Sequence, residues 1–362
     1  MSPAASPSSS SAGHASDSRT GLLLVNLGTP DAPTPAAVRR YLRQFLMDPR
    51  VIDIPAAVRW MLVNLVILPF RPRRSAAAYA SIWTERGSPL LAHSQDLVEL
   101  LRKTADDRFE IELGMRYGSP SIDSALGALI ERGCESIVVM PQFPQRSEAS
   151  WGSAVAEVYS AAARRDVVPA LEVVPPFYDD PDFLDALAEV TRPSLEDPAP
   201  ERWLISFHGL PERHIERVDR ACGGSPHCLV SPTCCDVISD DNRDCYRAHC
   251  FATARGLASR LGLAEGAWEV VFQSRLGRTP WISPYTDRRI LELAADGVKR
   301  LGVISPSFTS DCLETVEEIG IRGREEFLAA GGEELRLAPC LNSSPVWAEA
   351  ITKILSRSRP GR

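Results

Sequence analysis

The chain has 362 residues, of which 44% are hydrophobic and 24% are charged, and its formal net charge is −7. This length is sufficient for two domains, each with a core of its own. The balance of apolar and charged residues is typical of a soluble globular protein. The acidic net charge argues against a nucleic-acid partner, because such a partner favours a basic face.

The N-terminal residues 1–20 are rich in Ser, Ala and Pro and contain no apolar stretch that resembles a signal peptide. We expect a disordered leader here, and a protein that stays in the cytoplasm. In that reducing compartment, clustered cysteines bind metals or carry out redox chemistry more often than they form disulfides.

Short apolar runs alternate with helix-length amphipathic segments along most of the chain. Strands are predicted at residues 21–27, 111–115, 136–140, 171–174, 203–207, 268–273 and 300–305. Helices are predicted at residues 95–104, 121–132, 149–164, 181–191, 246–261, 287–299 and 313–329. Strands that are apolar on both faces and separated by helices indicate parallel sheets covered on both sides.

A break near residues 174–180 divides this pattern into two similar halves. We therefore predict an α/β protein with two Rossmann-like domains, at residues 21–175 and 176–356, and a cleft between them. The segment 24–30 lacks the glycine spacing of a dinucleotide-binding loop, and the sequence contains no Gly-Lys-Ser/Thr phosphate loop. The ligand in the cleft is therefore expected to be something other than a nucleotide.

The longest apolar run, residues 60–70, is too short to span a membrane. Arg59 precedes it, and Arg71, Arg73 and Arg74 follow. One interpretation is the end of a buried helix. The other is a lip at residues 60–74 that rests peripherally on the inner face of a membrane.

His208 closes the predicted strand 203–207, and the following Gly-Leu-Pro ends that strand. A single histidine is more often structural than functional. Its position at the carboxyl edge of a parallel sheet favours a functional role. An imidazole there could accept protons near neutral pH or ligate a metal.

A second candidate site, at Asp311, Glu314 and Glu318, begins the predicted helix 313–329. Asp311 with Glu314 could simply form a capping box at the start of that helix. However, Glu314 and Glu318 are four residues apart and share a helix face, which suits a path for a metal ion or for protons.

Three further residues are candidates for the lining of the cleft. Arg116 and Tyr117 follow a predicted strand, and Trp281 lies among turn residues. Aromatic walls with arginines at the rim suit a large, flat, anionic ligand.

These segments together resemble the ferrochelatase family, whose members insert ferrous iron into protoporphyrin IX. The matching stretches are residues 25–31, 41–50, 114–118, 206–213, 280–281, 308–315 and 341–345. The resemblance covers residues 21–356 and implies the two-domain chelatase fold, with the porphyrin in the cleft.

The resemblance assigns roles to individual residues. His208 matches the active-site histidine and Glu314 its paired carboxylate, so both are expected to act on the incoming iron and on the pyrrole protons. Asp311 and Glu318 match acidic residues on the same helix, which often has a π-type widening. The pocket residues implied are Arg116, Tyr117, Trp281 and Ile52, the last at a lip position. Arg322 and Cys312 depart from patterns found in some members.

The activity implied is insertion of ferrous iron into protoporphyrin IX, with release of two protons. The segment 25–31 resembles the protoporphyrin enzymes more than the coproporphyrin branch. Alternatives are a coproporphyrin or sirohydrochlorin chelatase on the same fold. An alternative from another class is an Fe–S redox sensor or electron carrier.

Six of the nine cysteines lie between residues 222 and 250, and all of them except Cys250 fall within an apparent insertion at about residues 220–245. No Cys-x-x-Cys pair typical of a zinc ribbon occurs among them. Some ferrochelatases carry a [2Fe–2S] cluster, and thiolates suit such a cluster or structural zinc. Four of the six are expected to be ligands: Cys222, Cys228, Cys235 and Cys245 as first choice, with Cys234 and Cys250 as alternatives. Cys134, Cys312 and Cys340 are expected to be ordinary buried thiols.

Overall fold

The computed structural model describes residues 19–106, 108–221, 226–277 and 279–358. Residues 1–18 of the expected leader lie outside the described residues, whereas Thr20 already begins the first strand.

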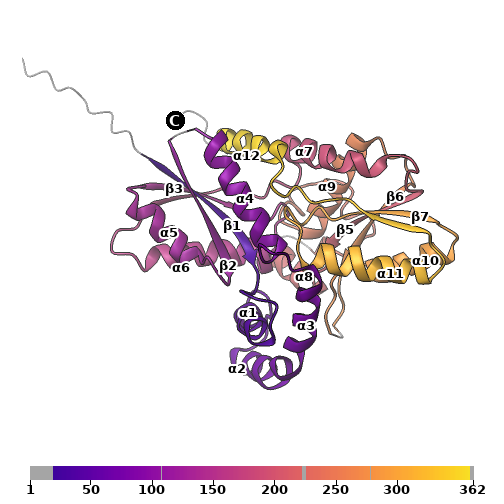
Figure 1. The fold of residues 1–362 in the computed structure, drawn as a ribbon, viewed down its shortest axis with the longest axis horizontal. Coiled ribbons are helices and arrows are strands. Elements are labelled where there is room, and N and C mark those ends of the chain that lie inside the picture. Colours follow the sequence, from indigo (N-terminus) through magenta and orange to yellow (C-terminus); the bar gives the residue numbers. More distant parts are fainter. Residues whose placement is uncertain (1–18, 107, 222–225, 278, 359–362) are drawn as a thin grey trace, which may run out of the picture.

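The first half of the chain forms a parallel sheet with the order β2-β1-β3-β4 (Figure 1). Its strands are β1 (Thr20–Gly28), β2 (Phe109–Tyr117), β3 (Ser136–Pro141) and β4 (Ala170–Val173). Helix α4 (Pro89–Thr104) packs on one face, and helices α5 (Ile122–Glu131) and α6 (Ser153–Ala163) pack on the other. Because both faces of the sheet are covered, β1 reads as a continuous apolar run.

The second half forms another parallel sheet, with the order β6-β5-β7-β8. Its strands are β5 (Arg202–His208), β6 (Trp268–Gln273), β7 (Arg300–Ile304) and β8 (Glu334–Leu337). Helix α9 (Tyr246–Leu261) covers one face, and helices α10 (Thr286–Ala295) and α11 (Arg324–Ala329) cover the other. The predicted α/β architecture with parallel sheets is confirmed.

The C-terminal helix α12 (Pro345–Ser358) packs against both α4 and α7 (Pro181–Thr191) (Figure 1). Trp347 of α12 is fully buried in a core that also contains Leu22 of the first sheet and Trp203 of the second. One hydrophobic core therefore joins the two sheets, and the domain boundary near residue 175 stays a prediction.

Between β1 and β2 the chain makes a group of helices that projects from the two sheets (Figure 1). These are α1 (Pro35–Met47), α2 (Ala56–Met61), the π-helix η1 (Leu62–Ile67) and α3 (Leu68–Ile82). Within the described part of the chain, no helix is both long and apolar enough to cross a membrane.

The structure differs from the sequence prediction at several elements, among them helices α1, α3 and α12, which have no predicted counterpart. The predicted α-helix 313–329 is a π-helix, η4 (Leu313–Gly323), followed by the short α11. Strand β8 has no predicted counterpart, because its four residues alternate polar and apolar at the edge of the sheet. The predicted helix 246–261 coincides with α9.

Candidate active site

The carboxyl edges of the two sheets face each other. Because β5, β6 and β7 are parallel, their ends at His208, Gln273 and Ile304 lie at one edge. The hydroxyl of Thr309, beyond β7, donates to the carbonyl of Gln142, beyond β3, at 3.3 Å. This contact ties the functional edge of one sheet to that of the other.

The backbone of His208 is held on both sides. Its N–H donates to the Ser307 hydroxyl at 3.1 Å, and its carbonyl accepts from the Tyr246 hydroxyl at 2.7 Å. Its ring Nδ1 lies 2.6 Å from the Gly209 carbonyl, which can only accept. Nδ1 must therefore carry the hydrogen, and in the neutral ring the lone pair is on Nε2.

Aromatic rings flank the His208 imidazole. The Trp281 ring centroid is 6.5 Å away and the Phe308 centroid is 6.3 Å away. Gly209 permits this approach, because a Cβ there would lie 2.9 Å from the Gln273 carbonyl oxygen and 3.2 Å from the Trp281 ring. The structure thus brings the predicted wall residue Trp281 next to the predicted histidine.

Glu314 lies in the first turn of η4, but the cap of that helix is not the predicted one. Cys312 is the N-cap and pairs with Thr315, whose hydroxyl accepts the Cys312 N–H at 3.0 Å. The carboxylate of Glu314 is therefore not used for capping. Its backbone carbonyl accepts a hydrogen bond from Gln273 at 2.7 Å, which fixes η4 against the end of β6.

Glu318 is bound through both carboxylate oxygens by Ser274. The Ser274 N–H donates at 2.8 Å and its hydroxyl at 2.6 Å, from a backbone with a φ of 66°. Burial raises the pKa of Glu318, Ser274 opposes that shift, the charge of Glu314 adds to it, and His208 opposes it. The two carboxylates and the imidazole therefore interact within one electrostatic group.

Asp311 anchors the start of η4. One carboxylate oxygen accepts from the Thr315 hydroxyl at 3.0 Å and the other from the Asn342 amide at 2.7 Å. The Asp311 N–H donates back to Asn342 at 2.8 Å. Asn342, which has a φ of 51°, has a role that the sequence prediction did not assign.

The helices between β1 and β2 also contribute to the surroundings of Glu314. Burial raises the pKa of Tyr41 and of Tyr79, and the negative charge of Glu314 adds to both shifts. Burial lowers the pKa of Arg71, and Glu314 opposes that shift. The sequence left Arg71 either at the end of a buried helix or on a lip, and in the structure it is partly buried and interacts with the charge of Glu314. No motif marked the two tyrosines.

The predicted pocket pair Arg116 and Tyr117 converges on a buried carboxylate, Asp48. Arg116 donates to it at 2.7 Å and the Tyr117 hydroxyl at 2.8 Å. Burial works to raise the pKa of Asp48, but hydrogen bonds, beginning with that from Ser153, bring it below its ordinary value. Tyr117 is only 1% exposed, so its part in the structure is to hold Asp48 in place.

Ile52 lies on a loop that is held by ion pairs to the helix that comes after His208 in the chain. Arg59 donates to the carbonyl of Ile52 at 3.1 Å. The neighbouring Asp53 carboxylate lies 2.6 Å from Arg213, 3.2 Å from His214 and 3.4 Å from Arg217. These three belong to helix α8 (Glu212–Ala221), which follows His208 directly. Burial works to raise the pKa of Asp53, but Arg213 and His214 lower it to about 2.

The described cysteines of the insertion come together, and Cys222 lies outside the described residues. Cys228, Cys234, Cys235, Cys245 and Cys250 are all buried in one cluster with Phe207 and Tyr246. The Cys245 thiol interacts with those of Cys228 and Cys235, and the interaction with Cys228 raises the pKa of Cys245 to about 12. The Cys234 and Cys235 sulfurs are 3.7 Å apart, and Arg247 donates to Cys235 at 3.1 Å.

No group of three or more His, Cys, Asp or Glu side chains is arranged to hold a metal ion among the residues that the structure describes.

Two solved structures share this architecture. SirB from Bacillus subtilis with Fe3+ has a TM-score of 0.51 at 12% identity, covering 94% of this chain and 96% of that one. The sirohydrochlorin chelatase SirB from Bacillus subtilis subspecies spizizenii in complex with cobalt has a TM-score of 0.50 at 10% identity, covering 94% and 95%. The fold is therefore that of the α/β metal chelatases.

Comparison with related sequences shows which family of metal chelatases the chain belongs to. The profile of the ferrochelatase family matches residues 19–359. A ferrochelatase from Coxiella burnetii is 46% identical over 94% of both chains. One from Legionella pneumophila is 47% identical over 93% of this chain and 99% of its own. The chain belongs to the ferrochelatase family, and it is a metal chelatase of the lyase class.

We expect Asp53→Asn to lower the free energy of unfolding at pH 7 by about 1.5–3 kcal/mol, because hydrogen bonds to a charged group are lost. A carboxylate with a depressed pKa adds stability that is present above its ordinary value of 3.8 and is lost as the pH falls through about 2. Urea unfolding curves should therefore show the difference shrinking below about pH 4.

The matched control is Asp31→Asn, which breaks an exposed ion pair with Arg40 and should cost about 0.5 kcal/mol or less. A gap for Asp53→Asn that stays constant between pH 7 and pH 3 would contradict the role assigned to this carboxylate.

Proposed function

We propose that the protein inserts ferrous iron into protoporphyrin IX, giving protohaem and two protons. Membership of the ferrochelatase family supports this proposal. The observation that carries it is that the imidazole of His208 and the carboxylate of Glu314 both act electrostatically on the carboxylate of Glu318 at one sheet edge. That group offers what the reaction needs: acceptors for two pyrrole protons beside a site for the incoming iron.

The fixed tautomer of His208 puts a basic lone pair on Nε2, which can receive a pyrrole proton or guide the metal. Glu314 is the partner carboxylate in this exchange. The raised pKa of Glu318 suits it to hold a proton on its way out, and Asp311 marks the other end of the same acidic path. Trp281 and Ile52 would wall the porphyrin, and a site that favours a distorted ring lowers the barrier to insertion.

A coproporphyrin or sirohydrochlorin chelatase is the alternative on this fold, and an Fe–S redox sensor or electron carrier is the alternative in another class. The fold shared with the SirB structures is compatible with the former. No observation in the structure favours either over protoporphyrin, so both are outcomes of the test below.

We expect His208→Ala and Glu314→Gln each to lower the kcat of metal insertion by roughly 10²–10⁴-fold, the usual contribution of a positioned proton acceptor. Anaerobic ferrous iron is the test metal, and zinc in air is a second probe, because nitrogen ligands also bind zinc well. The haem or zinc-porphyrin absorption spectrum gives the rate, and quenching of porphyrin fluorescence gives binding.

The control is Glu317→Gln, which removes a carboxylate from the same helix that is paired with Arg322 at 3.4 Å. It should keep activity within a few-fold. Turnover of coproporphyrin or sirohydrochlorin alone would replace the proposed substrate, and failure with every porphyrin would leave the redox alternative.

We also propose that the insertion at about residues 220–245, called the cysteine-rich segment from here on, binds a [2Fe–2S] cluster, with Cys222, Cys228, Cys235 and Cys245 as ligands. The contacts of the Cys245 thiol with Cys228 and Cys235 support three of these four. Cys250, fully buried against Tyr246, is less suited. Cysteine thiolates are the usual ligands of such clusters, which when bound can supply a redox-active iron centre. Structural zinc is the alternative occupant.

We expect Cys228→Ser to abolish the visible absorption of the cluster and to lower bound iron and acid-labile sulfide, because one ligand is lost. Cys134→Ser removes an equally buried thiol far from the segment and should keep both. Zinc without iron or sulfide in the purified protein would replace the cluster by structural zinc. Full colour in Cys228→Ser would remove Cys228 from the ligands.

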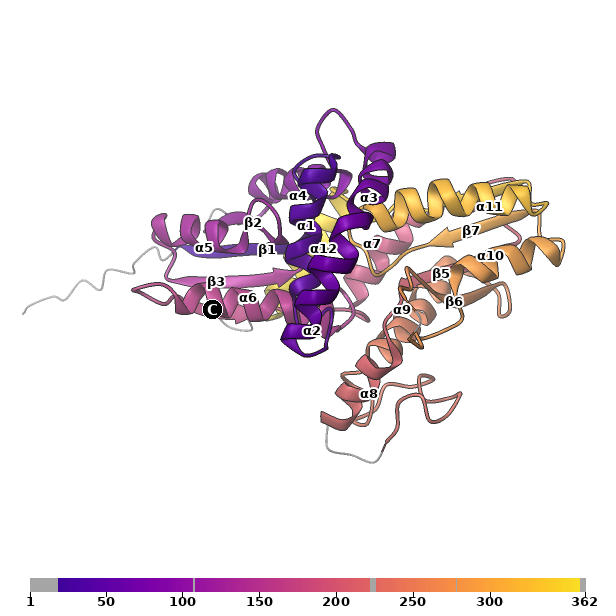
Figure 2. The same ribbon diagram turned by 90° about the horizontal axis from the view of Figure 1, so that it is seen from below.

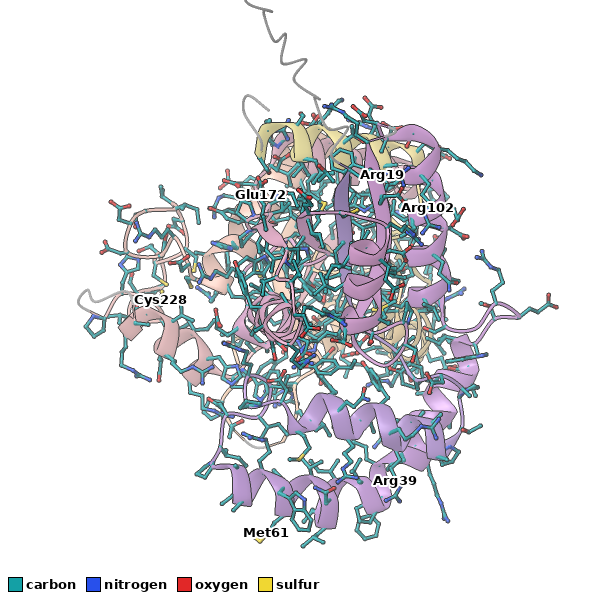
Figure 3. The ribbon with its side chains drawn as sticks, turned by 90° about the vertical axis from the view of Figure 1, so that its left-hand side faces the viewer. Arg19, Arg39, Met61, Arg102, Glu172 and Cys228 are labelled. Carbon is teal, nitrogen blue, oxygen red and sulfur yellow. The ribbon has the colours of Figure 1, made fainter. Side chains whose placement is uncertain are left out.

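Finally, we propose that residues 60–74 contact the inner face of the membrane from the cytoplasm. Trp60, Met61, Leu65, Val66 and Phe70 are all exposed, Phe70 by 77%. They lie on α2, η1 and the start of α3, where Met61 occupies the outer tip (Figure 3). The exposed Arg73 and Arg74 stand beside this patch, which suits an anionic lipid surface.

We expect the double variant Leu65→Ser, Phe70→Ser to lose at least ten-fold in binding to vesicles containing anionic phospholipid, because each apolar side chain contributes roughly 1.5 kcal/mol or more when buried. Co-sedimentation with the vesicles measures this. Val167→Ser, an exposed valine on a loop of the first half, is the control. Equal binding of all three proteins would rule out the lip as the contact.

A further inference from the structure

Tyr246 stands where the cysteine-rich segment meets the strand that ends in His208. It is the first residue of α9, immediately after the thiol of Cys245. Its hydroxyl donates to the backbone carbonyl of His208 at 2.7 Å. A single side chain thus links the helix that begins directly after the segment to His208, the residue expected to accept the pyrrole protons.

The surroundings of Tyr246 keep this link in place. The side chain is only 6% exposed, and burial raises its pKa well above the ordinary value, so its hydroxyl remains a donor at working pH. The thiol of Cys250, one turn further along α9, is buried in the same cluster as Tyr246. Tyr246 is therefore packed among the buried cysteines while its hydroxyl reaches the His208 carbonyl.

A second connection runs through α8, which extends beyond the second sheet together with the residues from 226 to 245 (Figure 2). The Asp219 carboxylate near its end accepts from the N–H groups of His227 at 3.0 Å and Cys228 at 3.3 Å. Near its start, Arg213 binds Asp53 on the loop of Ile52. Cys228 itself lies in a part of the molecule well separated from Met61 (Figure 3).

These contacts indicate that the cysteine-rich segment positions residues of the site and does not take part in the reaction itself. Metal insertion transfers no electron, so a thiol centre that touches the site only through backbone and helix contacts can act on the reaction only by placing residues. The bond from Tyr246 acts on the residue that must be placed most accurately, because small displacements of a catalytic group lower the rate steeply.

We propose that Tyr246 is a positioning residue for His208, and that it is the link through which the cysteine-rich segment acts on metal insertion. The expected effect on the rate of metal insertion rests on the proposed function. The role of Tyr246 in fixing the position of His208 does not depend on which porphyrin the enzyme uses.

Tyr246→Phe tests this link, because it removes only the hydroxyl. We expect kcat for zinc insertion into protoporphyrin IX to fall by roughly ten-fold, since a buried carbonyl loses its donor. The KM for porphyrin should stay within about two-fold, because the pocket walls are untouched. The pH profile of kcat should change, and the ring ¹H–¹³C NMR signal of His208 should move. The visible absorption of the proposed [2Fe–2S] cluster should remain, because no ligand is changed.

Two further variants separate the outcomes. Cys245→Ser should move the His208 signal in the same direction as Tyr246→Phe, whereas Cys134→Ser should not. Tyr159→Phe, at an exposed tyrosine, is the control for the loss of a hydroxyl. If the His208 signal does not move in Tyr246→Phe, the positioning role is wrong. If the signal moves in Tyr246→Phe but not in Cys245→Ser, the link to the cysteine-rich segment is wrong. If the wild-type protein inserts no metal but the His208 signal still moves in Tyr246→Phe, only the proposed function is contradicted.

Discussion

The parallel pairing of β5 with β6 and β7 is the constraint on which the site depends. It brings three strand ends to one edge, so that His208, the Gln273–Ser274 turn and the start of η4 become neighbours. Each then fixes another: Gln273 holds the Glu314 backbone, and Ser274 holds the Glu318 carboxylate. An antiparallel arrangement would send alternate ends to opposite edges and separate these groups.

Buried and partly buried carboxylates hold the remaining parts around that edge. Asp48 gathers Arg116 and Tyr117, Asp53 ties the loop of Ile52 to α8, and Asp311 binds Asn342 of the closing segment. Each of these negative charges is compensated by donors, which is the condition for burying it. Glu318 differs, because burial and the charge of Glu314 raise its pKa, which suits the proton transfer proposed for it.

The sequence predicted the strands well because a buried parallel strand is apolar throughout, as Leu22, Leu23 and Leu24 of β1 are. It also predicted α9, whose bounds match. It did not predict η4 as a π-helix from its own pattern, since the apolar spacing of residues 313–329 fits an ordinary helix, and only the resemblance suggested a widening. Nor did it predict β8, a short edge strand.

Among the site residues, the sequence by itself determined the candidates: a histidine at a strand end, a series of acidic residues and a concentration of cysteines. Only the tertiary structure decided their partners. Arg71, Tyr41 and Tyr79 come near Glu314, and Tyr246 reaches His208, across separations in the chain that no local pattern encodes. The physical reason is that strand identity depends on local burial, whereas the environment of a charge depends on which distant side chains the packed core brings beside it.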